Sequence, residues 1–134
     1  MTNANWVFDR AIHLMDEQDE QTGDTNTQDT EEYRGRTLSI LNVLRYDLFP
    51  LSDNYKLTED GRRPLLAMIE NFDDDIGLDD VVAQSILPYG LAAHLYLGED
   101  NSKASFFNQK YEELKVTLGG KKAAVWEDIP INFM

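Results

Sequence analysis

The stretch from Leu78 to Leu97 constrains the fold most, because it is apolar on almost every side of the helix that its spacing predicts. Such a helix is stable in water only when other elements cover several of its sides, so we expect it at the centre of a helical bundle. Pro88 lies inside it and removes a backbone donor, so the helix is expected either to bend there or to break. The apolar residues are Val81, Val82, Ile86, Leu87, Tyr89, Leu91, Ala92, Ala93, Leu95, Tyr96 and Leu97.

Three further helices are predicted around this one from apolar residues that recur at steps of three and four. Their expected ranges are about 5–15, 30–48 and 102–118. Pro50 is expected to stop the second of them, and Gly119-Gly120 to stop the last. The predicted fold class is all-α: a small bundle of about four helices in a single domain that spans residues 1–134.

The same patterns predict helix caps and the faces that turn toward the core. The expected caps are Asn3 or Asn5, Asp29 in a capping box with Glu32, Asp79 or Asp80, and Asp100 or Ser102. The expected core side of the second helix carries Tyr33, Thr37, Ile40, Leu41, Leu44 and Leu48. That of the last helix carries Phe106, Phe107, Lys110, Tyr111, Leu114 and Leu118.

Two segments outside the helices carry apolar residues. Residues 51–75 contain an Asp60-Gly61 turn signal, which favours an extended excursion or a short β-hairpin; a short helix over 65–70 is the alternative. Residues 121–134 form an expected C-terminal tail that is interrupted by Pro130 and is too apolar to stay free. Such a tail needs a partner surface on its own domain or on another subunit. The candidate interface residues are Trp126, Ile129, Ile131 and Phe133.

Acidic residues dominate the charge, with 25 Asp and Glu against 12 Lys and Arg and a formal net charge of −13. Eight of the acids lie in residues 16–32, a run without a basic or large apolar side chain, and removing them leaves −5. We interpret this run as a mobile acidic loop. A chain with this charge is repelled by phosphate, so specific nucleic-acid binding and adsorption to anionic membranes are not expected.

No residue pattern indicates catalysis, a cofactor or a metal. The chain has no cysteine, and neither acidic cluster, 16–32 or 70–80, fits the register of a calcium loop. His13 and His94 are far apart in the sequence, and His94 is interpreted as a core or interface residue. Phosphate loops and nucleophile elbows are missing, and no apolar stretch is long enough to span a membrane. The sequence therefore predicts a protein that is not an enzyme.

The second half of the chain combines three features. The Asp-rich turn 73–80 leads into Ile86-Leu87-Pro88-Tyr89-Gly90-Leu91-Ala92-Ala93-His94-Leu95, and an aromatic helix with Phe106-Phe107-Asn108-Gln109-Lys110-Tyr111-Glu112-Glu113-Leu114 follows. Arg36-Thr37-Leu38-Ser39-Ile40-Leu41-Asn42 on the second helix fits the same pattern. Over about residues 33–118 the chain resembles the small head–tail connector proteins, or head-completion adaptors, of tailed phages and prophages.

The resemblance implies a structural adaptor that joins the portal ring to the tail machinery. Its implied partners are the portal protein, tail or stopper proteins, and further copies of itself that assemble into a ring on the portal. The DNA would pass nearby without being held. The implied location is the neck of the virion, and the host bacterial cytoplasm during assembly. The resemblance brings no catalytic residues with it, and it is silent on residues 16–32, which we expect to face the channel or the outer rim.

Two other classes of function remain as alternatives. An acidic protein-binding module, such as an inhibitor that mimics DNA, would use the negative charge directly. A mimic needs carboxylates on a rigid surface, whereas the acids here crowd a predicted loop. A small metal-dependent enzyme is disfavoured because the two histidines are isolated.

Overall fold

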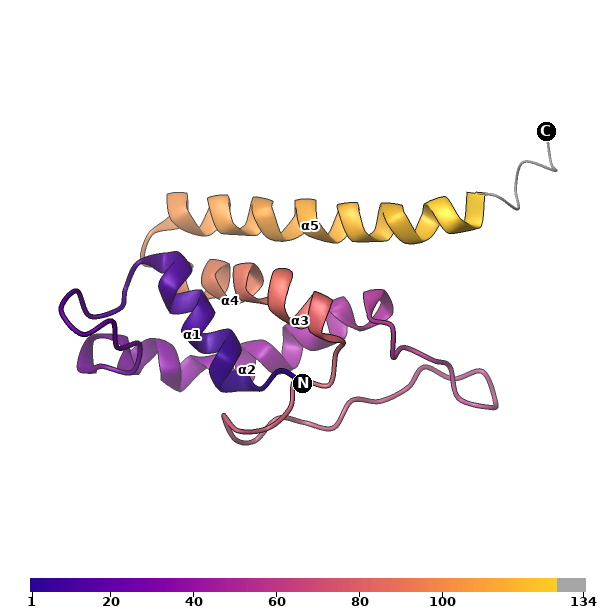
Figure 1. The fold of residues 1–134 in the computed structure, drawn as a ribbon, viewed down its shortest axis with the longest axis horizontal. Helices are drawn as coiled ribbons and strands as arrows, with labels where there is room; N and C mark the ends of the chain where they lie inside the picture. The colour runs from indigo at the N-terminus through magenta and orange to yellow at the C-terminus, as the bar shows by residue number, and fades with distance from the viewer. Residues whose placement is uncertain (128–134) are drawn as a thin grey trace.

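The computed structural model describes the backbone of residues 1–127 and the side chains of residues 1–119. Within this part the chain is helical and has no strand, which confirms the all-α class (Figure 1). The helices are α1 (Ala4–Met15), α2 (Glu31–Leu48), α3 (Asp80–Ser85), α4 (Leu87–Tyr96) and α5 (Asn101–Glu127). Short 3₁₀ turns at Gln28–Thr30 and Phe49–Leu51 precede and follow α2.

Helix α4 lies at the centre, where it packs against α1, α2, α3 and α5. Its side chains explain this position, because Leu87, Leu91, Ala92 and Leu95 are all fully buried. The expected central helix is therefore confirmed over this part of its range.

The predicted continuous helix over 78–97 is interrupted at Ile86, which confirms the alternative of a break. Ile86 ends α3 and precedes α4, with φ −107° and ψ −48°. Pro88 falls in the first turn of α4, where its missing donor would have had no partner within the helix. Asp79 caps α3 as expected, because its carboxylate accepts the Val82 N–H at 3.0 Å.

Gly90 on α4 lies where three helices meet. A Cβ atom added there would lie 2.7 Å from Cε1 of Tyr111 on α5 and 3.1 Å from Cδ1 of Leu44 on α2. Only glycine allows this approach. Tyr96 and Phe107 stack along the same α4–α5 contact, with ring centroids 6.0 Å apart.

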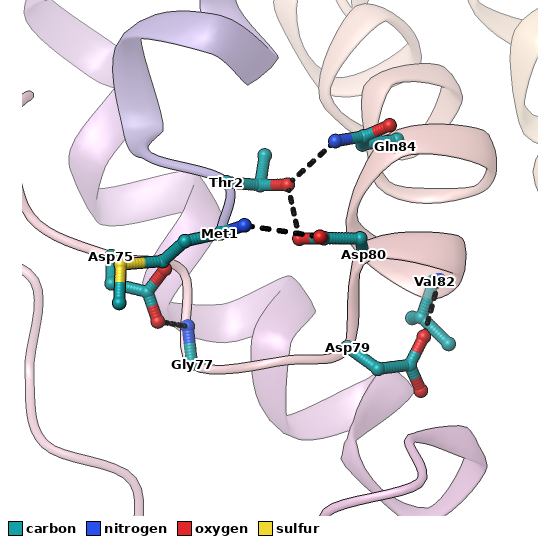
Figure 2. Close-up of polar contacts among 8 residues, drawn as sticks. All are labelled: Met1, Thr2, Asp75, Gly77, Asp79, Asp80, Val82 and Gln84. Carbon is teal, nitrogen blue, oxygen red and sulfur yellow. Dashed lines mark hydrogen bonds and ion pairs between the residues drawn. The ribbon is translucent and has the colours of Figure 1, made fainter.

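The first residues of the chain are anchored on the Asp-rich turn. The Thr2 carbonyl accepts the Ile76 N–H at 2.8 Å, and Asn3 bridges to Asp75. Figure 2 shows the Thr2 hydroxyl donating to Asp80 at 2.8 Å while it accepts from Gln84 at 3.0 Å. Asn3 then caps α1 as expected by accepting the Trp6 N–H. Asp75 and Asp80 of this turn therefore help to hold the first residues of the chain in place.

Helix α5 corrects the prediction that Gly119-Gly120 would end it, because the helix continues to Glu127. Gly119 lacks the positive φ of a helix-ending glycine, and the Lys and Ala residues that follow favour helix. Phe107, Tyr111, Leu114 and Leu118 turn toward the core as predicted. Phe106, which is 58% exposed, and Lys110 do not, so these two predictions were wrong.

The loops differ from expectation in detail. Thr27 and Thr30, not Asp29 and Glu32, form the capping box that precedes α2. Residues 52–79 contain neither the short hairpin nor the short helix that the sequence allowed. They form an extended excursion with turns at residues 53–54, 59–60 and 72–73. At the second turn the Thr58 N–H donates to the Arg62 carbonyl at 2.9 Å.

Candidate interaction surface

The extended segment 63–69 runs along α2 and is held there by side chains. The Asn42 amide donates to the Ile69 carbonyl at 3.0 Å and accepts the Ile69 N–H at 2.9 Å. The Tyr46 hydroxyl likewise donates to the Leu66 carbonyl at 3.2 Å and accepts the Leu66 N–H at 3.1 Å. These two side chains therefore satisfy both backbone groups of Leu66 and of Ile69.

We call the backbone N–H and C=O groups of Leu65 and Ala67 the 65–67 edge. Among the described residues, these four groups have no hydrogen-bond partner. Exposed apolar side chains flank them, because Leu65 is 89% and Met68 72% exposed. Val43, on the next turn of α2 from Tyr46, is 68% exposed. An extended edge of this kind can accept a strand from another chain.

A buried arginine fixes the geometry behind this edge. Arg45 is 3% exposed, and its Nε donates to the Ile76 carbonyl at 2.6 Å while its guanidinium donates to the Asn42 side chain at 2.9 Å. Burial lowers the pKa of Arg45 from its ordinary value. Sequence reasoning missed this role, because arginine is ordinarily exposed.

The acidic loop is held by its own side chains. The Asp19 carboxylate accepts the N–H groups of Thr22 and Gln21, which lowers the pKa of Asp19. Asp24 accepts the Asn26 N–H, and Thr25 donates to Asp9 on α1. Among the described residues, no three histidine or acidic side chains are placed to hold a metal ion.

The two histidines are not brought into one site. His13 is exposed on α1 and His94 is exposed on α4. Of the two interpretations of His94, the core residue was wrong and the interface residue stays a prediction. His94 lies on the rim of an open hollow between α4 and α5 that Leu97, Asn101 and Ser105 also line. Within residues 1–127, no helix has both the length and the apolar character needed to cross a membrane.

The predicted interface residues lie at or beyond the end of the described chain. Trp126 belongs to the last turn of α5, and its side chain is outside the described residues. Ile129, Ile131 and Phe133 are outside them as well. Their role stays a prediction.

Comparisons with protein families, with curated proteins and with solved structures found no match to this chain. The described residues define a small all-α protein with one core. Its candidate functional feature is the 65–67 edge, which sequence reasoning missed. The signal that could have found it is the run of one proline and five apolar residues over 64–69 that follows two arginines.

Proposed function

We propose that this chain is a structural adaptor of a tailed phage or prophage, joining the portal ring to the tail machinery as part of a ring around the DNA channel. It works by binding other proteins and carries out no reaction. Its partners are the portal protein, tail or stopper proteins, and neighbouring copies of itself. Its place is the neck of the virion, after assembly in the bacterial cytoplasm.

The observation that carries this proposal is that the residues of the family resemblance converge on one packing unit. Gly90, from the Leu-Pro-Tyr-Gly-Leu-Ala-Ala run, touches Tyr111, from the aromatic helix, and Leu44 on α2. The Asp-rich turn before that run anchors the start of the chain. The residues that carry the resemblance therefore contact one another in the fold. Such contacts are expected when a sequence pattern reflects a shared fold.

Charge also supports the proposal. A ring around a DNA channel has to let the duplex slide through, and phosphate contacts would retard it. A formal net charge of −13 favours passage over binding. Exposed acids of the 16–32 loop suit a position on the channel or the outer rim, where they need no protein partner.

The decisive experiment mixes this chain with the portal ring encoded beside its gene and weighs the assembly by native mass spectrometry. We expect several copies to bind one portal ring, and binding to persist when DNA fragments are added. Failure to bind at about 50 µM, well above the micromolar affinities of typical assembly contacts, would contradict the adaptor. Binding to a basic protein that DNA displaces would instead support the inhibitor alternative.

A further inference from the structure

We propose that a groove between α1 and α5 binds an acidic amphipathic helix of a partner protein. A large apolar side chain of that helix occupies one end of the groove, and a carboxylate one turn away lies at the other end. The inference goes beyond the proposed function, because it derives the chemistry of a binding partner from this surface alone. We call the surface the α1–α5 groove, and the residues that define it are Arg10, Leu14, Tyr89, Phe106, Lys110 and Leu114.

The groove arises because α1 and α5 both pack on α4. It consists of two adjoining hollows of about 370 and 360 Å³ that share Leu14. The first hollow lies between the end of α1 and the start of α5, which Figure 1 shows close together. From Lys103 to Leu114 the α5 wall is about 16 Å long, which is the length of three helical turns.

The first hollow is apolar. Met15 and Phe107 line it and are only 4% and 7% exposed, and Leu14 beside them is half-buried. Phe106 lines the same hollow but is 58% exposed, with its ring edge-on to Phe107 at 5.4 Å between centroids. An apolar side chain of a partner that enters this hollow would remove the Phe106 ring from water, which favours binding.

The second hollow carries two cations on opposite walls. Arg10 of α1 and Lys110 of α5 both line it and are exposed. Neither of them forms an ion pair with any side chain of residues 1–119. The guanidinium of Arg10 lies 5.1 Å from the centre of the Trp6 ring, which restricts its position. Tyr89 of α4, which is half-buried, lies on the floor of this hollow.

The acids near these two cations bind other groups. Glu113, one turn along α5, accepts a hydrogen bond from Gln109 at 3.2 Å. Asp80, which lines the surface beside Arg10, accepts from the N-terminal amino group at 3.0 Å and from Thr2 at 2.8 Å. Two positive charges therefore stay uncompensated in a chain whose formal net charge is −13. A carboxylate of a partner is the group that pairs with both.

The spacing of the two ends predicts the residue pattern of the partner. Phe106 and Lys110 are four residues apart on α5, so they lie about 6 Å apart along its axis. A second helix in the groove presents side chains at the same interval when they are three or four positions apart. The partner should therefore carry a large apolar residue with Asp or Glu three or four positions away.

The groove also explains why two residues of α5 did not match their predicted places. Phe106 and Lys110 follow the periodic spacing of the core residues closely enough to have been assigned to the core side. They lie beside the buried stripe on the side of α1, where the groove leaves them uncovered.

The first test titrates the ¹⁵N-labelled full chain with an Ala-based helical peptide of about 12 residues and follows amide signals by NMR. The peptide carries a central Leu and a Glu four positions to either side, so it can bind in both directions. We expect the amides of Leu14, Phe106 and Lys110 to shift, with a Kd between about 0.1 and 1 mM.

A peptide with Gln in place of both Glu residues is the matched control and should bind about tenfold more weakly. The net charge of the chain repels the Glu peptide more than the Gln peptide, so a preference for Glu requires local cations. The proposal is overturned if the Glu peptide shifts none of the three amides at about 5 mM, or if the two peptides bind equally.

The second test removes the two cations one at a time. Arg10→Gln and Lys110→Gln should each weaken binding of the Glu peptide about threefold or more and leave the Gln peptide within about twofold. Lys56→Gln is the control, because Lys56 is also exposed and without an ion pair among the described side chains but lies on the 52–79 excursion. An equal loss in Lys56→Gln and Lys110→Gln would contradict the assigned surface.

The third test removes the aromatic ring at the apolar end. Phe106→Ala should weaken both peptides about threefold or more, because both carry the central Leu. Val116→Ala is the control, because Val116 is 72% exposed on the same helix and lines a different hollow. Similar losses in the two variants would place the peptide elsewhere. A dimer of the full chain that Phe106→Ala dissociates in sedimentation equilibrium would make the occupant a second copy and overturn the proposed partner.

Peptide display on the full chain tests the partner chemistry without a designed sequence. We expect selected peptides to combine acids with large apolar residues three or four positions away, although an acidic protein ordinarily attracts basic peptides. Selection of basic peptides, or of the same acidic peptides by a chain carrying both Arg10→Gln and Lys110→Gln, would contradict the proposal.

These tests fail independently of the proposed function. A chain that binds the portal ring but none of the acidic peptides remains an adaptor without this groove site. A chain that binds the acidic peptides but not the portal ring would keep the groove site and lose the phage setting.

Discussion

Gly90 shows how much a single residue decides in this fold. Its neighbours Tyr111 and Leu44 occupy the space that any side chain would need. We predict that Gly90→Ala destabilises the protein by up to about 2 kcal/mol, because a clash of up to about 3 kcal/mol outweighs the ~1 kcal/mol gained in helix propensity. Urea unfolding followed by circular dichroism measures the difference.

Gly35 offers the matched control within α2. A Cβ atom added there meets nothing within 4 Å, so only the propensity gain remains. Gly35→Ala should therefore stabilise the protein by about 0.5–1 kcal/mol. Similar effects of the two substitutions would show that α4 does not approach α5 as closely as described.

Carboxylates of the Asp-rich turn should make stability depend on acid pH. The N–H groups of Glu70 and Asn71 lower the pKa of Asp74. Burial raises the pKa of Asp79, but hydrogen bonds from Val82 and Asp53 outweigh it and the pKa ends below its usual value. A depressed folded-state pKa contributes stability above the unfolded value of about 3.9 and loses it as pH falls through the folded value.

We predict that the free energy of unfolding decreases as pH falls below about 4, and that Asp74→Asn makes this decrease shallower. Chemical denaturation at a series of pH values measures both slopes. Asp29→Asn is the control, because Asp29 is exposed and accepts no hydrogen bond from the described residues. An equal change of slope in both variants would refute the role of Asp74.

Residue-scale features were predictable where the partner is close in sequence. Asn3 and Asp79 cap the helices that directly follow them, and the sequence predicted each as one of two candidates. Arg45 and Gly90 act on residues more than twenty positions away. Spacing along one helix says which side is apolar, but it does not say which other helix that side meets.

Among the helices, α5 tests how strongly glycine interrupts a helix. A Cβ atom on Gly119 would lie 3.8 Å from Leu51, an ordinary contact, and the backbone there is not left-handed. We predict that Gly119→Ala stabilises the protein by about 0.5–1 kcal/mol and raises its helical circular dichroism signal. A destabilising effect of similar size would mean that Gly119 ends the helix, as the sequence pattern first indicated.

Element boundaries were less predictable than the elements themselves. The helix over 78–97 was expected from its apolar content, yet Ile86 divides it because Pro88 fits a first turn and not an interior. The excursion over 52–79 has no periodic pattern of its own. Its path depends on Asn42 and Tyr46, which lie on another element, and this is why the candidate surface was not predicted.

At the scale of the whole molecule, the first residues of the chain contact α3, which lies far from them in the sequence. Thr2 is 2% exposed, and its hydroxyl links Asp80 and Gln84. We predict that Thr2→Val, which keeps the shape and removes the hydroxyl, destabilises the protein by about 1–2 kcal/mol. Hydrogen exchange should locate the loss in the first turns of α1 and α3. Thr117→Val, on the exposed side of α5, should change stability by less than about 0.5 kcal/mol.

For the whole molecule, the sequence predicted the all-α class and the central helix, but it did not predict the contact between Thr2 and α3. A helix that is apolar all round has to be covered by other helices on several sides. The place of the core could therefore be predicted from the sequence of α4. The anchoring of residues 2–5 on 72–76 could not be foreseen, because its backbone hydrogen bonds use groups that every residue carries.

Contacts between residues far apart in the sequence also affect how the chain folds during translation. Residues 2 and 80 bond across 78 positions, and Tyr96 reaches the Met15 carbonyl across 81. Helix α1 therefore emerges from the ribosome long before the surfaces that will bury it. Contacts of such separation slow folding and leave apolar residues uncovered meanwhile. The core therefore forms only after α3 and α4 have emerged from the ribosome.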